Sequence, residues 1–62
     1  MKTYKIFFRV YGLETHEMIT LVEAESYLKA FEVGFEKILS LYPADIDNNR
    51  IPFITNVEKV EE

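Results

Sequence analysis

The fold is decided by residues 26–42, which read SYLKAFEVGFEKILSLY. With about 100° of rotation per helical residue, the large apolar side chains of this stretch gather within about 60° of Phe31. These side chains are Tyr27, Leu28, Phe31, Phe35, Ile38 and Tyr42. Charged side chains such as Glu32 and Glu36 occupy the opposite side. The pattern predicts one amphipathic helix whose apolar side packs on a sheet.

Both ends of this helix carry clear signals. Ser26 is a good N-cap, because its hydroxyl accepts a hydrogen bond from a backbone N–H one turn later. Pro43 ends the helix, since the residue before a proline avoids the α region. Gly34 lies near the apolar side, where it costs roughly 1 kcal/mol of helix propensity relative to alanine. We interpret it as a point of close packing between helix and sheet.

Two segments before the helix alternate apolar and polar residues. Residues 2–11 form the first strand, and its uncharged face is expected to point at the helix. That face consists of Tyr4, Ile6, Phe8 and Val10. Residues 16–24 form the second strand, after a turn at 12–15 in which Gly12 is free to take a positive φ. Two hairpin registers remain open, one setting Phe7 against Ile19 and the other setting Phe7 against Leu21.

A third strand follows the helix. Residues 43–50 form a polar loop, and residues 51–60 are predicted to be the strand. Pro52 near its start suits a strand beginning or a sheet edge. The alternation of this strand breaks near Asn56, where a β-bulge would restore it.

The element order strand–strand–helix–strand predicts an α+β fold. We expect one small ββαβ domain over residues 1–62, with a three-stranded, mostly antiparallel sheet and the helix on one face. The third strand is placed beside the first, giving the order 2-1-3, because the most apolar strand then lies in the centre. The alternative is a right-handed crossover that sets the third strand parallel to the second.

The composition of the chain excludes several kinds of stabilisation, location and ligand. The chain has no cysteine, so neither a disulfide nor a thiolate metal site strengthens its small core, which leaves good packing or oligomerisation. No signal peptide and no apolar run of membrane-spanning length is visible, so a cytoplasmic location is expected. The net charge of −4 disfavours nucleic acid as a ligand. The first strand is nevertheless basic, with Lys2, Lys5 and Arg9, and we expect it to pair with acids of the second.

The sequence offers little catalytic chemistry. His16 is the one histidine, and no nucleophile–base pair is apparent, so we expect a protein that is not an enzyme and holds no cofactor. Residues 45–49, DIDNN, match the opening of a calcium loop, but Arg50 stands where the loop requires glycine. We therefore expect no metal site there, and a turn with Asx-type hydrogen bonds instead.

The outer face of the sheet is the candidate site. One helix covers one face of a three-stranded sheet, and the other face should then be polar. Here it carries Phe7, Ile19 and Leu21, with Tyr11 at its end. A cluster of exposed apolar residues on adjacent strands marks an interface, so these residues are predicted to bind a partner protein or to form a dimer.

These features predict a small, acidic, non-enzymatic homodimer that binds another protein and blocks or bridges it. The candidate acidic contact surface consists of Glu32, Glu36, Asp45 and Asp47, which would compete for a basic surface. In composition alone, the chain resembles the short inhibitors and accessory proteins encoded by phages and mobile elements. The alternative is a nucleic-acid-binding module that uses the basic, aromatic first strand.

Overall fold

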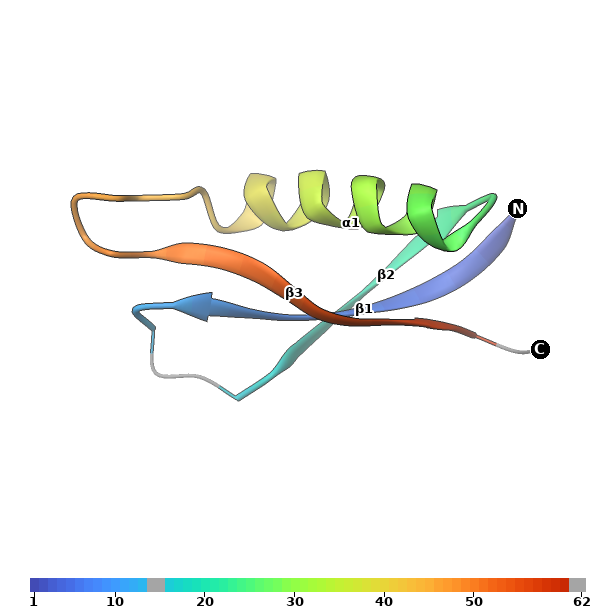
Figure 1. Cartoon of the computed structure of the whole chain (residues 1–62), viewed down its shortest axis with the longest axis horizontal. Helices are drawn as coiled ribbons and strands as arrows, with labels where there is room; N and C mark the ends of the chain where they lie inside the picture. Colours follow the sequence, from blue (N-terminus) through green and yellow to red (C-terminus); the bar gives the residue numbers. More distant parts are fainter. Residues whose placement is uncertain (14–15, 61–62) are drawn as a thin grey trace.

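The computed structural model describes residues 1–13 and 16–60. Its elements in chain order are β1 (Lys2–Tyr11), β2 (Met18–Ala24), α1 (Tyr27–Leu41) and β3 (Ile51–Lys59). The sheet has the order β2-β1-β3 with both pairings antiparallel, and α1 runs along one side of it (Figure 1). The predicted α+β fold and strand order are therefore confirmed. The crossover that would have made the third strand parallel is excluded, because β3 pairs with β1.

The pairing of β1 with β2 selects one of the two registers left open by the sequence. Phe7 lies opposite Ile19, and Lys5 lies opposite Leu21. Lysine on β1 therefore faces an apolar residue of β2, and the expected pairing of a basic first strand with an acidic second strand is wrong. Within residues 1–13 and 16–60, the ion pair formed is Lys29–Glu32 on α1, with 3.5 Å between Nζ and Oε2.

A bulge shapes the pairing of β1 with β3. Phe7 lies opposite Asn56 while Phe8 lies opposite Ile54, so Thr55 is an extra residue on β3. The bulge predicted near Asn56 is thereby confirmed. Its effect is that Ile54 and Val57, which are three residues apart, both pack against the core. Without the extra residue, strict alternation would send one of them to the opposite face.

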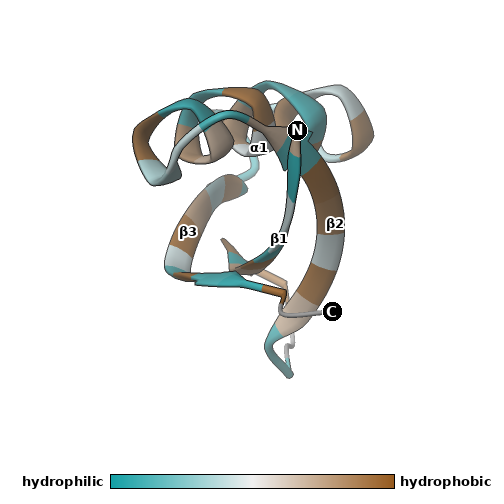
Figure 2. Ribbon diagram, turned by 90° about the vertical axis from the view of Figure 1, so that its right-hand side faces the viewer, coloured by the Kyte–Doolittle hydropathy of each residue, from teal (hydrophilic) through white to brown (hydrophobic). Residues whose placement is uncertain are grey.

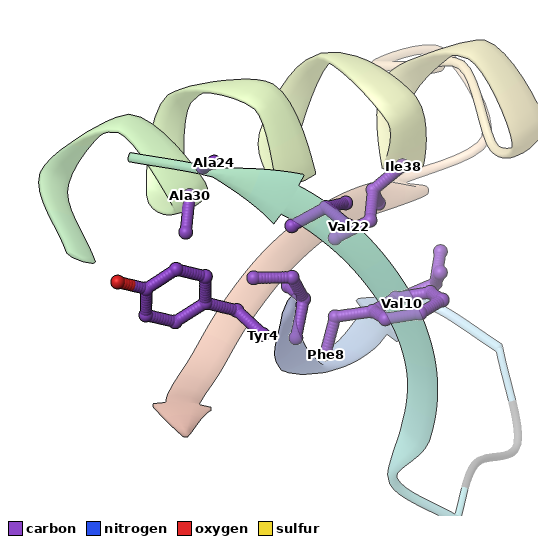
Figure 3. Packing of buried hydrophobic residues seen from close by; sticks show 8 residues of the cluster. Tyr4, Phe8, Val10, Val22, Ala24, Ala30 and Ile38 are labelled. Atoms are coloured by element: carbon purple, nitrogen blue, oxygen red, sulfur yellow. The ribbon is translucent and has the colours of Figure 1, made fainter. Parts of the chain in front are cut away.

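The core lies between β1 and α1. The inward row of β1 is buried along its whole length, as predicted, and consists of Tyr4, Ile6, Phe8 and Val10. From β2, Val22 and Ala24 join it, while α1 contributes Ala30 and Ile38 (Figure 3). Two aromatic contacts connect the two ends of α1 with the inward row of β1. Tyr27 meets Tyr4 edge-on at 5.0 Å between ring centroids, and Tyr42 meets Phe8 at 5.9 Å.

The helix is rotated from the expected orientation. Its buried residues are Ala30, Gly34 and Ile38, whereas Phe31 and Phe35 keep 46% and 37% of their surface exposed. The prediction that both phenylalanines belong to the core is wrong. At Gly34 the backbone of α1 lies so close to Ile6 of β1 that even a Cβ atom would be crowded there. The large side chains turn to the flank instead.

The structure confirms the predicted ends of the helix and the predicted turn at Gly12. Ser26 caps α1, since its Oγ accepts a hydrogen bond from the Lys29 backbone N–H at 3.2 Å. Tyr42 is the C-cap and donates its N–H to the Ile38 carbonyl at 2.7 Å, directly before Pro43. Gly12 takes a φ of 90°, as the predicted turn requires. Residues 14–15 of that turn lie outside the described part of the chain.

Candidate interaction surface

The outer sheet face is the set of β-strand side chains that point away from α1. Phe7, Tyr11, Ile19 and Leu21 all lie on it, as predicted, because their neighbours Ile6, Val10 and Val22 are buried on the other side. Phe7 and Ile19 face each other across β1 and β2. Ile19 and Leu21 are each more than half exposed, and Tyr11 is 65% exposed. The structure therefore brings the four predicted residues onto one surface.

Two further apolar residues belong to this face and were missed. Ile51 lies opposite Tyr11, and Phe53 lies opposite Arg9, so both point outward from β3. Their exposed fractions are 45% and 43%. The signal was present in the sequence, since Ile51 and Phe53 flank Pro52 at the two-residue spacing of one strand face. With them, the apolar surface extends across all three strands.

The two outer strands approach each other over this face. Thr55 on the bulge of β3 donates its hydroxyl to Glu17 Oε2, just before β2, at 2.6 Å. Because β1 lies between β2 and β3, this hydrogen bond crosses it. Figure 2 shows β2 and β3 curving towards each other on the side of β1 away from α1. The coiling leaves Phe7, in the middle strand, only partly exposed.

Cations stand in the middle of the outer sheet face. Lys5 and Arg9 are exposed residues of β1, in the same outward row as Phe7. Lys5 lies opposite Leu21 on one side and Glu58 on the other, while Arg9 lies opposite Phe53. The face is thus an apolar surface with positive charge along its central strand and acids on the neighbouring strands.

The candidate acidic residues are divided between two segments. Glu32 and Glu36 are exposed on α1, and Glu32 also pairs with Lys29. Asp45 and Asp47 lie in the loop that follows the helix. Among the residues that the structure describes, no group of three or more His, Cys, Asp or Glu is arranged to hold a metal ion.

The loop at 45–50 is a closed turn. Asp45 and Arg50 exchange backbone hydrogen bonds of 2.7 and 2.8 Å, and Asn49 takes a positive φ of 56°. The Asp45 carboxylate accepts the Asn48 backbone N–H at 3.3 Å and the Asn48 side-chain amide at 2.7 Å. The predicted Asx-type turn is confirmed. The side-chain hydrogen bond from Asn48 is the main reason why the pKa of Asp45 is lowered from its usual value.

A second apolar surface lies on α1, where the sequence had predicted core. We call it the helix stripe and define it as Leu28, Phe31 and Phe35. Leu28 is 72% exposed, and the rings of Phe31 and Phe35 stack on each other with centroids 6.5 Å apart. The side of α1 that does contact the sheet is the line of Ala30, Gly34 and Ile38, at four-residue spacing.

Comparisons with protein-family models, with curated proteins and with solved structures found no match to this chain. Within the described residues, no helix is both long and apolar enough to cross a membrane.

Proposed function

We propose that this protein is a non-enzymatic interaction protein, a homodimer that binds another protein through its outer sheet face and thereby blocks or bridges it. The observation that carries the proposal is the apolar surface across β2, β1 and β3. It consists of Phe7, Tyr11, Ile19, Leu21, Ile51 and Phe53. Exposed apolar side chains gathered on neighbouring strands of one sheet face mark a site of association.

The accessible area supports the same proposal. The chain exposes 4610 Å², whereas a compact monomer of 7.3 kDa is expected to expose about 4,200 Å². The chain is elongated, with extents of 39 × 19 × 14 Å, and its one helix lies on one side of the sheet. Association with a partner would remove such surface from water, which stabilises the complex by roughly 25 cal/mol for each Å² of apolar area.

The charge on this face indicates the chemistry of the partner. Lys5 and Arg9 lie among the apolar residues of the central strand. A partner segment whose acidic side chains lie between apolar ones would pair with these central cations while burying the apolar side chains around them. The exposed acids Glu32 and Glu36 of α1 and Asp47 of the loop would meet a basic surface on the same partner, while the Asp45 carboxylate is engaged by Asn48.

The test compares three proteins in quantitative affinity capture from a lysate of the native host. They are the wild type, Leu21→Lys on the outer sheet face, and Ser40→Lys as the control. Ser40 is exposed on α1, so the control adds the same charge away from the sheet. We expect wild type and Ser40→Lys to enrich the same partner, and Leu21→Lys to lose it. The captured partner is then purified and its affinity for each protein is measured directly. Full binding by a folded Leu21→Lys protein would refute the proposal.

The alternative function is a nucleic-acid-binding module. The observation in its favour is that exposed Lys5 and Arg9 share the outer sheet face with Phe7 and Tyr11. In proteins that bind single-stranded nucleic acid, bases stack on aromatic side chains while cations neutralise the phosphates. It is tested by titrating the protein with a single-stranded oligonucleotide at increasing salt. Affinity that falls steeply with salt and is lost in Arg9→Ala would favour this function over protein binding.

A further inference from the structure

The sheet has two free edges, one along β2 and one along β3 (Figure 2). Successive residues of a strand direct their backbone groups to opposite sides, so every second residue of an outer strand directs its N–H and C=O away from the sheet. Such a row of unpaired groups is a template on which another strand can form. The two edges differ in how they are protected against this pairing.

The free backbone groups of β2 belong to Ile19, Leu21 and Glu23. The Thr3 carbonyl accepts the Val60 N–H at 2.9 Å, so the backbone groups of Thr3 point towards β3. Glu23 lies opposite Thr3 and therefore makes no ladder hydrogen bond with β1. By alternation, the same holds for Leu21 and Ile19. These three residues are exposed and present their N–H and C=O groups along one side of β2.

The edge along β3 is interrupted in two ways. Pro52 lies opposite Val10, whose backbone groups point away from β3, so Pro52 directs its nitrogen to the free edge. Proline has no N–H to offer to an added strand. Farther along, the bulge at Thr55 breaks the regular row of backbone groups. Proline and bulges are features with which natural sheets keep their edges from pairing.

The edge along β2 is guarded by one side chain. Lys37 of α1 donates a hydrogen bond from Nζ to the Leu21 carbonyl at 2.9 Å. This bond lies at the surface, and a backbone N–H of an added strand would replace it at little cost. Among the residues that the structure describes, no carboxylate pairs with Lys37. The ammonium group is thus held at the edge of β2, where a carboxylate of another chain can pair with it.

We propose that the free edge of β2 takes up an extended strand of the partner protein, and that this strand carries an acidic residue that pairs with Lys37. The inference rests on the proposed function, because it adds an edge contact to binding by the outer sheet face. In an antiparallel pair, residues directly opposite each other point to the same face. Apolar residues opposite Ile19 and Leu21 would therefore extend the outer sheet face, while the residue between them points towards α1 and Lys37.

Charge disfavours a second copy of this chain as the added strand. A twofold axis at Leu21 would set this residue against Leu21 of the second copy. Both Lys37 ammonium groups would then lie at the axis, since each is held at the Leu21 carbonyl. Like charges placed together in an interface repel each other. The same lysine therefore opposes pairing of two β2 edges and favours a strand with an acidic residue.

Amide NMR titration of the wild type with two short synthetic peptides tests the proposal. Both peptides consist of valine and threonine, with one glutamate at the centre of the first and one lysine at the same place in the second. We expect the glutamate peptide to slow hydrogen exchange of the Ile19, Leu21 and Glu23 amides. It should bind roughly fivefold more tightly than the lysine peptide, which corresponds to about 1 kcal/mol for an exposed ion pair. Unchanged exchange of these amides at millimolar peptide would refute the proposal.

Charge reversal at Lys37 tests the role of this side chain. Lys37→Glu should prefer the lysine peptide, because the charge at the edge of β2 changes sign. The control is Lys29→Glu, which makes the same exchange elsewhere on α1, where Lys29 pairs with Glu32. This variant should keep the preference of wild type. The inference fails if folded Lys37→Glu still prefers the glutamate peptide. It also fails if the three edge amides respond to protein concentration without peptide, since a second copy would then be the strand.

A proline at position 23 separates the edge from the outer sheet face. Glu23→Pro removes an N–H that makes no bond to β1, and Val22 already has the extended backbone that a following proline requires. Glu23→Gln is the matched control, and the amide spectrum of each variant shows whether it is folded. The partner purified by affinity capture should bind both Glu23→Pro and Leu21→Lys more weakly than wild type.

The two proposals can fail separately in this measurement. Weaker binding of Leu21→Lys alone would leave the outer sheet face as the site and overturn strand addition. Weaker binding of Glu23→Pro alone would support strand addition and overturn binding by the outer sheet face. Full binding of the partner by both folded variants would refute both proposals.

Discussion

Gly34 of α1 rests directly on Ile6 of β1, since a Cβ atom at position 34 would lie 2.8 Å from Ile6 Cγ1 and 3.0 Å from its Cδ1. Ile6 is completely buried in the middle of the central strand, so it has no free space to move into. The glycine thus lets the helix backbone come close to the sheet. This approach turns Phe31 and Phe35 to the flank of α1 and creates the helix stripe.

Substitution Gly34→Ala should destabilise the protein. The added methyl group overpacks the contact with Ile6, which lowers the free energy of unfolding by about 1–3 kcal/mol. The higher helix propensity of alanine raises it by only about 1 kcal/mol. We expect a lower midpoint of urea unfolding with an unchanged slope. The control is Ser40→Ala, which makes a similar exchange at an exposed position of α1 and should be neutral or slightly stabilising. Equal stabilisation by both variants would show that the helix does not pack closely at Gly34.

The rotation of α1 predicts an order of mutational effects. Ile38 is fully buried, so Ile38→Ala should cost roughly 2–5 kcal/mol of unfolding free energy. Phe35→Ala should cost less, because 37% of the surface of Phe35 is already exposed. Leu28→Ala should stay within about 0.5 kcal/mol of wild type. Thermal melts at low micromolar protein concentration would check this order. A loss in Phe35→Ala as large as that in Ile38→Ala would contradict it.

The N-cap of α1 gives a separate local prediction. Ser26→Ala removes the acceptor for the Lys29 N–H and should cost about 1 kcal/mol. Ser26→Asp restores an acceptor and places a negative charge at the helix N-terminus, where the dipole favours it. Its melting temperature should therefore match or exceed that of wild type. If Ser26→Ala melts like wild type, the cap contributes nothing to stability.

The Asp45 turn makes stability depend on pH. Because the hydrogen bond from the Asn48 side chain lowers the pKa of Asp45, the carboxylate contributes stability that is fully present above its unfolded-state pKa. That contribution is lost as pH falls through the lower folded-state pKa. Asp45→Asn should thus melt below wild type at about pH 6, and the difference should shrink towards pH 2. Asp47→Asn removes a charge from the same loop without removing the Asn48 hydrogen bond, and serves as the control.

Calcium should have no effect on the 45–50 loop. Both carboxylate oxygens of Asp45 already accept hydrogen bonds from Asn48, and the turn is closed by backbone bonds to Arg50. A ligand that binds only the folded state raises the melting temperature. Melts with millimolar calcium and with a chelator should therefore coincide. A rise with calcium that disappears in Asp45→Asn would establish a metal site.

Local patterns in the sequence determined much of this fold. The two-residue alternation of β1 predicted its buried row, because successive side chains of a strand point to opposite faces. Placing that uncharged row under the helix left Phe7 outward, and the same reasoning on β2 left Ile19 and Leu21 outward. Ser26 and Pro43 marked the ends of α1 through the chemistry of single residues. These features depend only on near neighbours in the chain, so they can be read from the sequence.

Tertiary structure decided the rest. Both hairpin registers gave acceptable pairs, and only the assembled sheet set Phe7 against Ile19. The bulge at Thr55 gave β3 its final facing and brought Phe53 to the outer sheet face. The rotation of α1 could not be predicted from the sequence. Helical periodicity shows which side chains share a side of the helix, but it does not show how closely that side approaches a sheet. The bulk of Ile6 against the backbone of Gly34 determined that distance, and the large side chains were excluded for lack of space.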